Sequence, residues 1–433
     1  MTKSKDSILA FQGRRTLLVG VEVTREGSPD VGEESVLSLQ ELERLASTLG
    51  LTVVHSEIQR RRELHPATYM GPGKAAELSE WIQSHRADCL IVDGEISGSQ
   101  QRTLESKLQC PVLDRTGIIL EIFSRHARSR EAKAQVELAS LEYVLSRVKG
   151  QWAHLERQKG GIGLRGIGER QIELDRRLIR DKMSRLKAEM ASFARRRTGE
   201  RQHRENFFRV ALVGYTNAGK STLMNQLTAS QVLVEDKLFA TLDSTIRLLD
   251  PKARPPILLS DTVGFIRHLP HSLVASFRST LAEVQQADLL LHVVDLSSSD
   301  YVQQKKTTED VLQELGVDLP TLVVFNKYDK VRRGFIPQVL ERSTPNSIVI
   351  SALYQTHIRR LRRTLSRYLE QRLQPMRLSI PYAESALLAR IQQVAKVQQK
   401  HYHEDSCEIE ILIREKDADY LKLSRYQLLA EAL

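Results

Sequence analysis

The stretch FFRVALVGYTNAGKS, residues 207–221, decides the fold of the second half of the chain. Its apolar run FFRVALVG is typical of a buried β-strand, and a helix is expected directly after the stretch. The last eight residues of the stretch, GYTNAGKS, residues 214–221, match the phosphate-loop pattern G-x-x-x-x-G-K-[ST]. Backbone N–H groups of such a loop can surround a β-phosphate. The stretch therefore predicts a nucleotide-binding α/β domain.

Three side chains of this loop have distinct expected roles. Lys220 would reach the β- and γ-phosphates, and Ser221 would offer its hydroxyl to Mg²⁺. Asn217 has two interpretations: its amide oxygen would help to hold K⁺ beside the phosphates, or it would merely shape the loop. The expected nucleotide contacts in this segment are Gly214, Tyr215, Thr216, Asn217, Ala218, Gly219, Lys220, Ser221 and Thr222.

The motif NKYD, residues 326–329, follows another strand-like run, TLVVF. The carboxylate of Asp329 can accept hydrogen bonds from N1–H and the 2-amino group of guanine, a donor pair that adenine lacks. The stem of Lys327 can lie along the base. The segment SAL, residues 351–353, would place a backbone N–H near the guanine O6, although an ordinary strand-end loop is the alternative. The expected base contacts are Asn326, Lys327, Tyr328, Asp329, Ser351, Ala352 and Leu353.

Two segments between these motifs predict the switches of a GTPase. In DTVG, residues 261–264, Asp261 would hold Mg²⁺ through water, and the Gly264 N–H would contact the γ-phosphate. In LFATLDST, residues 238–245, a threonine must bind Mg²⁺ directly and sense the γ-phosphate; Thr241 is our choice and Thr245 the alternative. The switch contacts are expected at Phe239, Ala240, Thr241, Leu242, Asp243, Asp261, Thr262, Val263 and Gly264, and the catalytic residues are expected to be Lys220, Thr241, Gly264 and Asn217.

The position after Gly264 is occupied by Phe265, where Ras-like enzymes have a glutamine that orients the attacking water. Phenylalanine cannot hydrogen-bond a water molecule. Either another group contributes to catalysis, or the intrinsic rate is low until a partner completes the site.

Strand and helix patterns predict an α/β protein of four parts. Residues 1–119 form an N-terminal α/β subdomain with a parallel sheet, and residues 120–204 form a long antiparallel helical hairpin. Residues 205–373 form a doubly wound phosphate-loop domain, and residues 374–433 a small C-terminal α/β module with one helix over residues 384–402. The glycine-rich stretch GGIGLRGIGERQIELDRR, residues 160–177, would lie at the hairpin tip.

The formal net charge of +10 is concentrated in this hairpin. From residue 125 to 204 there are 16 Arg and 5 Lys against 10 acidic residues, which leaves the remainder of the chain near neutrality. Such a segment indicates contact with a polyanion, and the alternative is a solvated pair of charged helices.

Composition narrows the class of protein further. The three cysteines, Cys89, Cys110 and Cys407, are scattered, which argues against a disulfide framework and against zinc spacing. No apolar run approaches the roughly 18 residues of a membrane span, and no secretory signal is evident. We therefore expect a cytoplasmic protein.

With these motifs in view, the chain resembles the HflX-type ribosome-associated GTPases, a branch of the Obg-HflX superfamily of the TRAFAC class. The resemblance covers residues up to about 370 and includes the segments between motifs. DRTGIILEIFSRHARSREAKAQVELASLEY, residues 114–143, is similar to the family's connection between sheet and hairpin, and DTVGFIRHLPHSLVASFRSTL, residues 261–281, to its second switch. After SAL the family often has glycine, whereas this chain has YQTHIRR at residues 354–360.

The resemblance implies that the protein binds GTP and GDP and acts on the large ribosomal subunit, probing rRNA with its hairpin tip. It implies splitting or rescue of stalled ribosomes under stress, by a protein that is a monomer on the ribosome. A weak ATPase of the N-terminal region has also been attached to the family; here GPGK, residues 71–74, gives only a weak anion-site signal, and a plain turn before a helix is the alternative. The expected rRNA contacts are Lys159, Arg165, Arg170, Arg176 and Arg177.

Two other functions fit the sequence less well. A regulatory switch whose hairpin binds a protein would not need a hairpin charge of +11. An RNA-binding protein with a vestigial GTPase would not need the intact set of Lys220, Ser221, Asp261 and Asp329.

Overall fold

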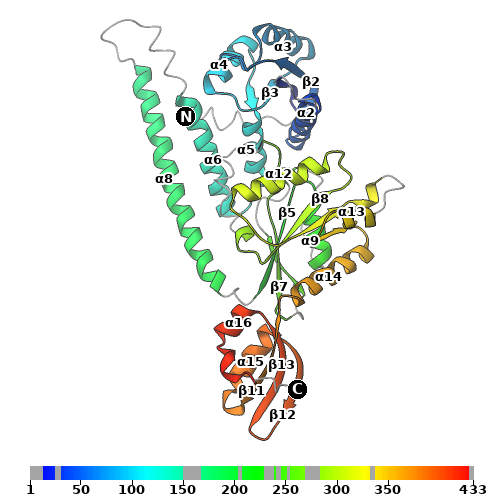
Figure 1. Cartoon of the computed structure of the whole chain (residues 1–433). Helices are drawn as coiled ribbons and strands as arrows, with labels where there is room; N and C mark the ends of the chain where they lie inside the picture. The colour runs from blue at the N-terminus through cyan, green and yellow to red at the C-terminus, as the bar shows by residue number, and fades with distance from the viewer. Residues whose placement is uncertain are drawn as a thin grey trace. The chain divides into compact units, whose positions relative to one another are not determined.

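The computed structural model describes residues 13–24, 31–149, 167–202, 207–228, 238–239, 245–250, 254–268, 283–331 and 337–428. The chain has an α/β fold that separates into two compact units (Figure 1). Unit 1 comprises residues 1–194, 236–243 and 267–279, and unit 2 comprises the remainder. The four-part division expected from the sequence, with boundaries at residues 119, 204 and 373, stays a prediction.

The N-terminal part of unit 1 is built on a four-stranded sheet. Its strand order is β2-β1-β3-β4 and every pairing is parallel, as the alternation of strands and helices predicted. The two inner strands carry apolar runs that are buried on both faces. The strands are β1 (Arg15–Val23), β2 (Thr52–Arg61), β3 (Cys89–Asp93) and β4 (Val112–Asp114), and the helices are α2 (Val31–Thr48), α3 (Pro72–His85), α4 (Gly98–Leu108) and α5 (Arg115–His126).

The helical hairpin consists of α6 (Arg130–Lys149) and α8 (Ile167–Gln202). Ion pairs join the two helices, Arg130 to Glu189 at 2.6 Å and Lys182 to Glu137. The hairpin was expected to begin at residue 120, but residues 120–126 belong to α5, and residues 127–129 separate this helix from α6. The physical reason is local: Ala127 is extended, and the Ser129 hydroxyl accepts the Ala132 N–H at 3.0 Å, which begins a new helix.

Asp114, at the end of β4, connects the hairpin to the sheet. Its carboxylate is fully buried and accepts the Gly117 N–H at 2.8 Å, so it caps α5. The same group accepts the Tyr143 hydroxyl at 2.7 Å and pairs with Arg147, both on α6. Burial, followed by the Asp114 charge, raises the pKa of Tyr143 far above its usual range. The tyrosine therefore stays protonated and donates.

Unit 2 contains a six-stranded sheet of order β10-β9-β8-β5-β7-β6, parallel except for β6. The predicted strands FFRVALVG and TLVVF are present as β5 and β9. Strand β6, which pairs antiparallel with β7, was not expected. The strands are β5 (Phe208–Gly214), β6 (Thr245–Asp250), β7 (Ile257–Asp261), β8 (Leu289–Asp295), β9 (Thr321–Asn326) and β10 (Ser347–Val349), and the helices are α9 (Lys220–Thr228), α12 (Tyr301–Glu314), α13 (Pro337–Ser343) and α14 (Gln355–Glu370).

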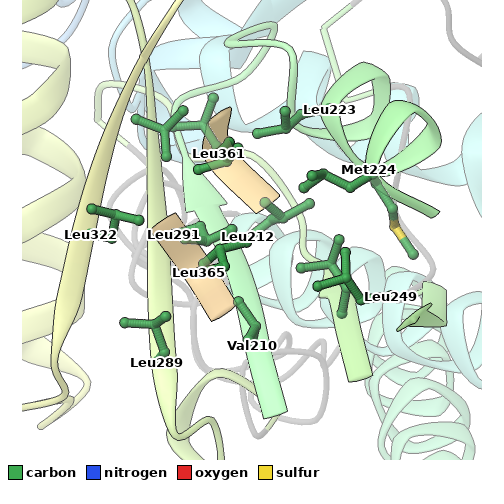
Figure 2. Close-up of a cluster of buried hydrophobic side chains, with 14 of the residues drawn as sticks. Val210, Leu212, Leu223, Met224, Leu249, Leu289, Leu291, Leu322, Leu361 and Leu365 are labelled. Carbon is green, nitrogen blue, oxygen red and sulfur yellow. The ribbon is translucent and has the colours of Figure 1, made fainter. Parts of the chain in front are cut away.

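Helices α9 and α14 close one face of this sheet with aliphatic side chains (Figure 2). Leu212 on β5 and Leu291 on β8 are fully buried, and Leu361 and Leu365 of α14 pack into the same cluster. Each such side chain contributes roughly 1.5–3 kcal/mol when removed from water. The cluster fixes the carboxyl ends of the strands, from which the site loops emerge.

The C-terminal module is a three-stranded antiparallel sheet, β11-β13-β12, with two helices. Its expected single helix over residues 384–402 is wrong: α15 ends at Val394, and residues 396–402 form β12 along β13. The interstrand pairing with β13 overrides the local helical spacing. The elements are β11 (Gln374–Pro381), α15 (Ser385–Val394), β12 (Lys396–Tyr402), β13 (Ser406–Ile413) and α16 (Glu415–Tyr420). Among the described helices, none has the length and apolarity that a membrane span needs.

We expect the buried ion pairs of Arg115 to contribute strongly to the unfolding free energy. Its guanidinium pairs with Glu41 at 2.7 Å and with Asp93 at 2.8 Å, and its side chain is 2% exposed. Arg115→Met leaves two buried carboxylates without their counter-charge and should cost about 3–5 kcal/mol of unfolding free energy. Urea unfolding followed by tryptophan fluorescence would measure it. Arg130→Met is the control, because its exposed pair with Glu189 should contribute under about 1 kcal/mol; equal losses would contradict the assignment.

Candidate functional site

The phosphate loop joins β5 to α9 and needs glycine at two positions. Gly214 has φ +146°, and a Cβ there would lie 2.2 Å from the Val293 carbonyl oxygen. Gly219 has φ +92°, and a Cβ there would lie 2.4 Å from Nδ2 of Asn326. Any other residue would strain the backbone and displace its neighbour. The structure therefore brings the loop against both the central strand and the NKYD segment.

Lys220 lies under this loop with its ammonium group turned inward. Its side chain is buried, and Nζ donates to the carbonyl oxygens of Gly214 at 3.0 Å and Tyr215 at 2.8 Å. Burial lowers the pKa of Lys220 to about 8, Asp261 opposes this effect and Lys327 adds to it. A phosphate beside Nζ would compensate the buried charge far better than two carbonyl dipoles do.

Ser221 and Asp261 bring two oxygen donors together at the expected Mg²⁺ position. The Ser221 hydroxyl donates to Oδ2 of Asp261 at 2.6 Å, and Asp261 at the end of β7 is fully buried. A hydroxyl and a carboxylate are oxygen ligands of the kind that Mg²⁺ prefers. The two residues thus fit the ion, although they come from motifs forty residues apart.

The DTVG segment closes over the phosphate loop at Gly264. A Cβ there would lie 2.7 Å from Thr216 Cα and 2.9 Å from Lys220 Nζ, so only glycine fits. Phe265 continues the contact: its N–H donates to Gly214 O at 3.2 Å, and its carbonyl accepts the Thr216 N–H at 2.8 Å. The Phe265 side chain is 2% exposed. Its ring is packed into the protein, which explains an apolar residue at this position.

Asn326 ties the phosphate loop to the SAL segment. Its Nδ2 donates to the Ala218 carbonyl at 3.0 Å, and its Oδ1 accepts the Ala352 N–H at 3.0 Å. On the same edge, the Ser351 hydroxyl donates to Oδ1 of Asp329 at 2.5 Å. This bond orients the carboxylate that the sequence assigned to guanine. The structure thus brings the GKS, NKYD and SAL segments together.

Lys327 stands between β9 and the base loop in the left-handed conformation, with φ +62°. Its Nζ pairs with Oδ2 of Asp295 at 2.7 Å, and the side chain is only 17% exposed. The pair fixes the aliphatic stem in one position beside Asp329. A fixed apolar stem is what packing against a planar base requires.

His357 is a site residue that the sequence reasoning missed. It lies in the first turn of α14, and its Nδ1 accepts the Ser351 N–H at 2.8 Å. The ring contacts Tyr354 and Tyr328, with centroid distances of 5.4 and 6.2 Å. The imidazole thereby holds the serine that orients Asp329. No motif marks it, because it lies in the segment YQTHIRR, residues 354–360, for which the sequence assigned no role.

This hydrogen bond requires His357 to be neutral. Partial burial and the nearby Arg360 lower the pKa of His357, and Asp329 opposes them. Arg360 itself pairs with Glu341 at 2.7 Å. The environment therefore keeps Nδ1 available as an acceptor at neutral pH.

Several predicted site residues lie outside the described residues. Phe239 is described: its ring packs edge-on against Phe123 of α5 at 4.6 Å and is 3% exposed. Thr245, the alternative switch threonine, begins β6 opposite Asp261. The predicted contacts that fall outside are Ala240, Thr241, Leu242, Asp243, Lys159 and Arg165.

The predicted rRNA contacts on α8 are described in part. Arg170 belongs to the helix, but its side chain is outside the described set. Arg177 is exposed and Arg176 partly buried. Beside them Leu174 and Leu178, one turn apart, are 55% and 52% exposed. This end of the hairpin therefore offers both cationic and apolar groups.

The GPGK segment is a helix start. Gly71 precedes α3, and Lys74 is held by the carboxylates of Glu57 and Glu77. A lysine neutralised by two acids is poorly suited to bind an anion. The plain-turn interpretation fits these contacts better than an anion site.

Three family models match the chain in succession. Residues 37–124 match the GTP-binding GTPase N-terminal model, and residues 126–204 match the GTP-binding GTPase middle region. Residues 209–327 match a model described as 50S ribosome-binding GTPase. The matches follow the order of the N-terminal sheet, hairpin and phosphate-loop domain.

Curated relatives match along most of their length. The GTPase HflX of Magnetococcus marinus is 47% identical over 85% of this chain and 86% of its own. The GTPase HflX of Escherichia coli is 39% identical over 92% of this chain and 97% of its own. Among solved structures, the complex of SsGBP with GDP matches with a TM-score of 0.46 and 25% identity, covering 82% of this chain and 99% of its own.

The acceptor role of His357 predicts a pH dependence of nucleotide affinity. Protonating Nδ1 removes the Ser351 contact, so GDP affinity should be constant above about pH 6.5 and fall as the pH drops below the usual histidine pKa. Folding stability has the same sign, since the unfolded chain binds the proton more readily. His357→Ala should weaken GDP binding about three- to tenfold at pH 7.5, the worth of one hydrogen bond.

The matched control is His357→Asn, whose Oδ1 can accept the same N–H without titrating. It should keep near-normal affinity and flatten the profile between pH 5.5 and 7.5. Equilibrium titration with a fluorescent GDP analogue measures all three proteins. Identical pH profiles for wild type and His357→Asn would refute the role of the imidazole.

Proposed function

The chain belongs to the HflX family of GTPases, and from that premise we propose that it acts on the large ribosomal subunit and splits or rescues stalled ribosomes. The description of the model that matches residues 209–327, 50S ribosome-binding GTPase, supports this partner. The observation that carries the proposal is the meeting of the phosphate loop with the DTVG, NKYD and SAL segments, combined with a hairpin segment of charge +11. We place the protein in the cytoplasm, as a monomer when ribosome-bound.

The chain is a GTPase, and we assign the nucleotide contacts as follows. On binding, Lys220 Nζ exchanges the carbonyls of Gly214 and Tyr215 for phosphate oxygens. Asp329, oriented by Ser351, accepts the N1–H and 2-amino protons of guanine. An adenine would leave this carboxylate without donors, which costs roughly 1–3 kcal/mol or more per lost contact.

A P-loop GTPase fold of this kind binds its nucleotide with Mg²⁺. We propose that Ser221 and Thr241 hold the ion directly and Asp261 through water; bound there, it neutralises charge on the β- and γ-phosphates. The Ser221 hydroxyl could ligate the ion through an oxygen lone pair and still donate its proton to Asp261. The Gly264 N–H would then donate a hydrogen bond to the γ-phosphate. The conformation of the DTVG segment would therefore depend on whether GTP or GDP is bound.

The buried ring of Phe265 leaves the orientation of the attacking water to another group. Asn217 is our candidate through a bound K⁺. It is exposed, and its left-handed φ of +59° places it at the turn of the phosphate loop. A cation held there would stabilise charge that develops between the phosphates, as an arginine finger does.

The exposed Leu174 and Leu178 favour the second candidate function, a switch whose hairpin binds a protein. A pull-down with purified ribosomal subunits, with and without a non-hydrolysable GTP analogue, separates the two candidates. Nucleotide-dependent retention on large subunits supports the ribosomal role. Retention on neither subunit supports the protein-binding switch.

The potassium hypothesis predicts faster GTP hydrolysis in KCl than in NaCl of equal concentration. Asn217→Ala should abolish the difference and lower the rate about tenfold or more, because the cation then loses a ligand. Single-turnover hydrolysis in matched salts measures it. Lys220→Ala serves as the inactive control, and equal wild-type rates in both salts would remove Asn217 from the mechanism.

The ribosomal role predicts that large subunits stimulate GTP turnover and that the factor dissociates subunits. Arg176→Gln with Arg177→Gln should weaken subunit binding and reduce its salt dependence by about one or two units of slope, since each phosphate contact contributes about 0.9. Hydrolysis and light scattering of subunit dissociation would be scored together. Binding that does not change between 50 and 200 mM salt would contradict an rRNA contact.

A further inference from the structure

Helix α14 carries a row of arginines that the nucleotide site does not use. Arg359, Arg363 and Arg367 recur every four residues along the helix and are exposed. At 1.5 Å per residue they follow one another at about 6 Å along the axis. We call these three residues the α14 arginine row. Figure 1 shows α14, in orange, packed on the phosphate-loop domain.

The opposite side of α14 explains why the helix is oriented this way. Ile358, Leu361, Leu365 and Leu369 are buried in the core of the domain. Their spacing of three and four residues fixes the apolar face and leaves the arginine row outside. The row is therefore a fixed surface of the folded domain, and its geometry does not depend on a loop.

The other cations of α14 are engaged within the protein. Arg360 pairs with Glu341 at 2.7 Å, and Arg362 donates to the Leu227 carbonyl. The helix has five arginines and one acidic residue, Glu370, which pairs with Lys396. Among the described residues, no hydrogen bond or ion pair is found for the arginine row.

Three like charges at successive four-residue spacings oppose helix formation. Each such pair destabilises an isolated helix by about 0.2–0.5 kcal/mol, which the buried leucine face outweighs. A solvated row explains the exposure of these residues, but it gives no benefit that offsets the repulsion. A polyanion laid along the row would relieve it.

We propose that the α14 arginine row binds the phosphate backbone of double-helical RNA. The choice of RNA as the polyanion rests on the proposed function; the row itself does not. One guanidinium group can donate two parallel hydrogen bonds to two oxygens of the same phosphate, whereas a lysine ammonium cannot form this bidentate contact. A straight row matches the regular phosphates along one strand of an A-form helix, which proteins recognise by shape and backbone.

The test compares full-length variants for binding to a fluorescein-labelled 16-base-pair RNA duplex. The first variant is R359Q/R363Q/R367Q, and the second, R359K/R363K/R367K, keeps the charge but loses the paired donors. The matched control is K306Q/R342Q/K400Q, which removes three exposed cations from α12, α13 and β12. Intrinsic GTP hydrolysis and the melting temperature report folding and should be at wild-type levels or above.

The row predicts a distinct result for each protein. The glutamine triple should bind the duplex at least about tenfold more weakly at 100 mM KCl, and its salt slope should fall by about two to three. The lysine triple should keep the slope and lose part of the affinity. The control should differ from wild type by less than about twofold. Wild-type affinity and slope in the glutamine triple would overturn the proposal.

Two further probes separate other polyanions. Poly-glutamate and vesicles rich in anionic lipid are tested as competitors of the duplex. If either binds the wild type more tightly than the duplex does, and the glutamine triple loses that binding, the row serves an acidic protein or a membrane and the RNA proposal fails. Failure of both to compete supports RNA.

Failure of the arginine-row proposal can be distinguished from failure of the proposed function. Duplex binding that depends on the row, without stimulation of GTPase by large subunits, would retain this proposal and reject the proposed function. If large subunits still stimulate the GTPase of the glutamine triple, and this variant binds the duplex as tightly as wild type does, the proposed function is retained and the arginine-row proposal is rejected.

Discussion

The two hydrogen bonds of Asn326 are the constraint on which the rest of the site depends. One amide group accepts from the SAL segment and donates to the phosphate loop, each at 3.0 Å. Gly219 must lack a side chain to allow this approach. Segments more than a hundred residues apart are thereby held in one geometry. We therefore expect a nucleotide that is bound through its phosphates to have its base at a fixed distance from Asp329.

The functional side chains in the described part of the site have polar partners within the protein. Lys220 donates to backbone carbonyls, Ser221 donates to Asp261, and Asp329 accepts from Ser351. We expect nucleotide binding to exchange the carbonyl partners of Lys220 for phosphate oxygens, so that little of the polar surface is left unpaired at any stage. Asp329 and Ser351 would keep their bond. We therefore expect the phosphate side to rearrange and the base side, which His357 holds, to stay in place.

Local sequence predicted those parts of the fold and site that short segments determine. The phosphate loop, the strand-end positions of Asp261 and Asp329, and the parallel N-terminal sheet follow from glycine spacing and apolar runs. Interactions distant in sequence were not predictable. Strand β12 depends on pairing with β13, and His357 acquires its role only where α14 meets the SAL segment. The positive charge of α14 was not evident from the sequence, because acidic residues elsewhere leave the chain outside residues 125–204 near neutrality.

The affinity of Asn326→Ala for GDP tests the central claim most directly. Removal of both bonds leaves the Ala352 N–H and the Ala218 carbonyl unpaired, which should cost about 3 kcal/mol. The account predicts that the Kd, measured with a fluorescent GDP analogue, rises about a hundredfold and that the melting temperature also falls, because the same two bonds stabilise the folded chain. The single variant Asp329→Ala is the control and should abolish GDP binding. If it does so while the Kd of Asn326→Ala stays within threefold of wild type, the claim that Asn326 couples the two halves of the site is contradicted.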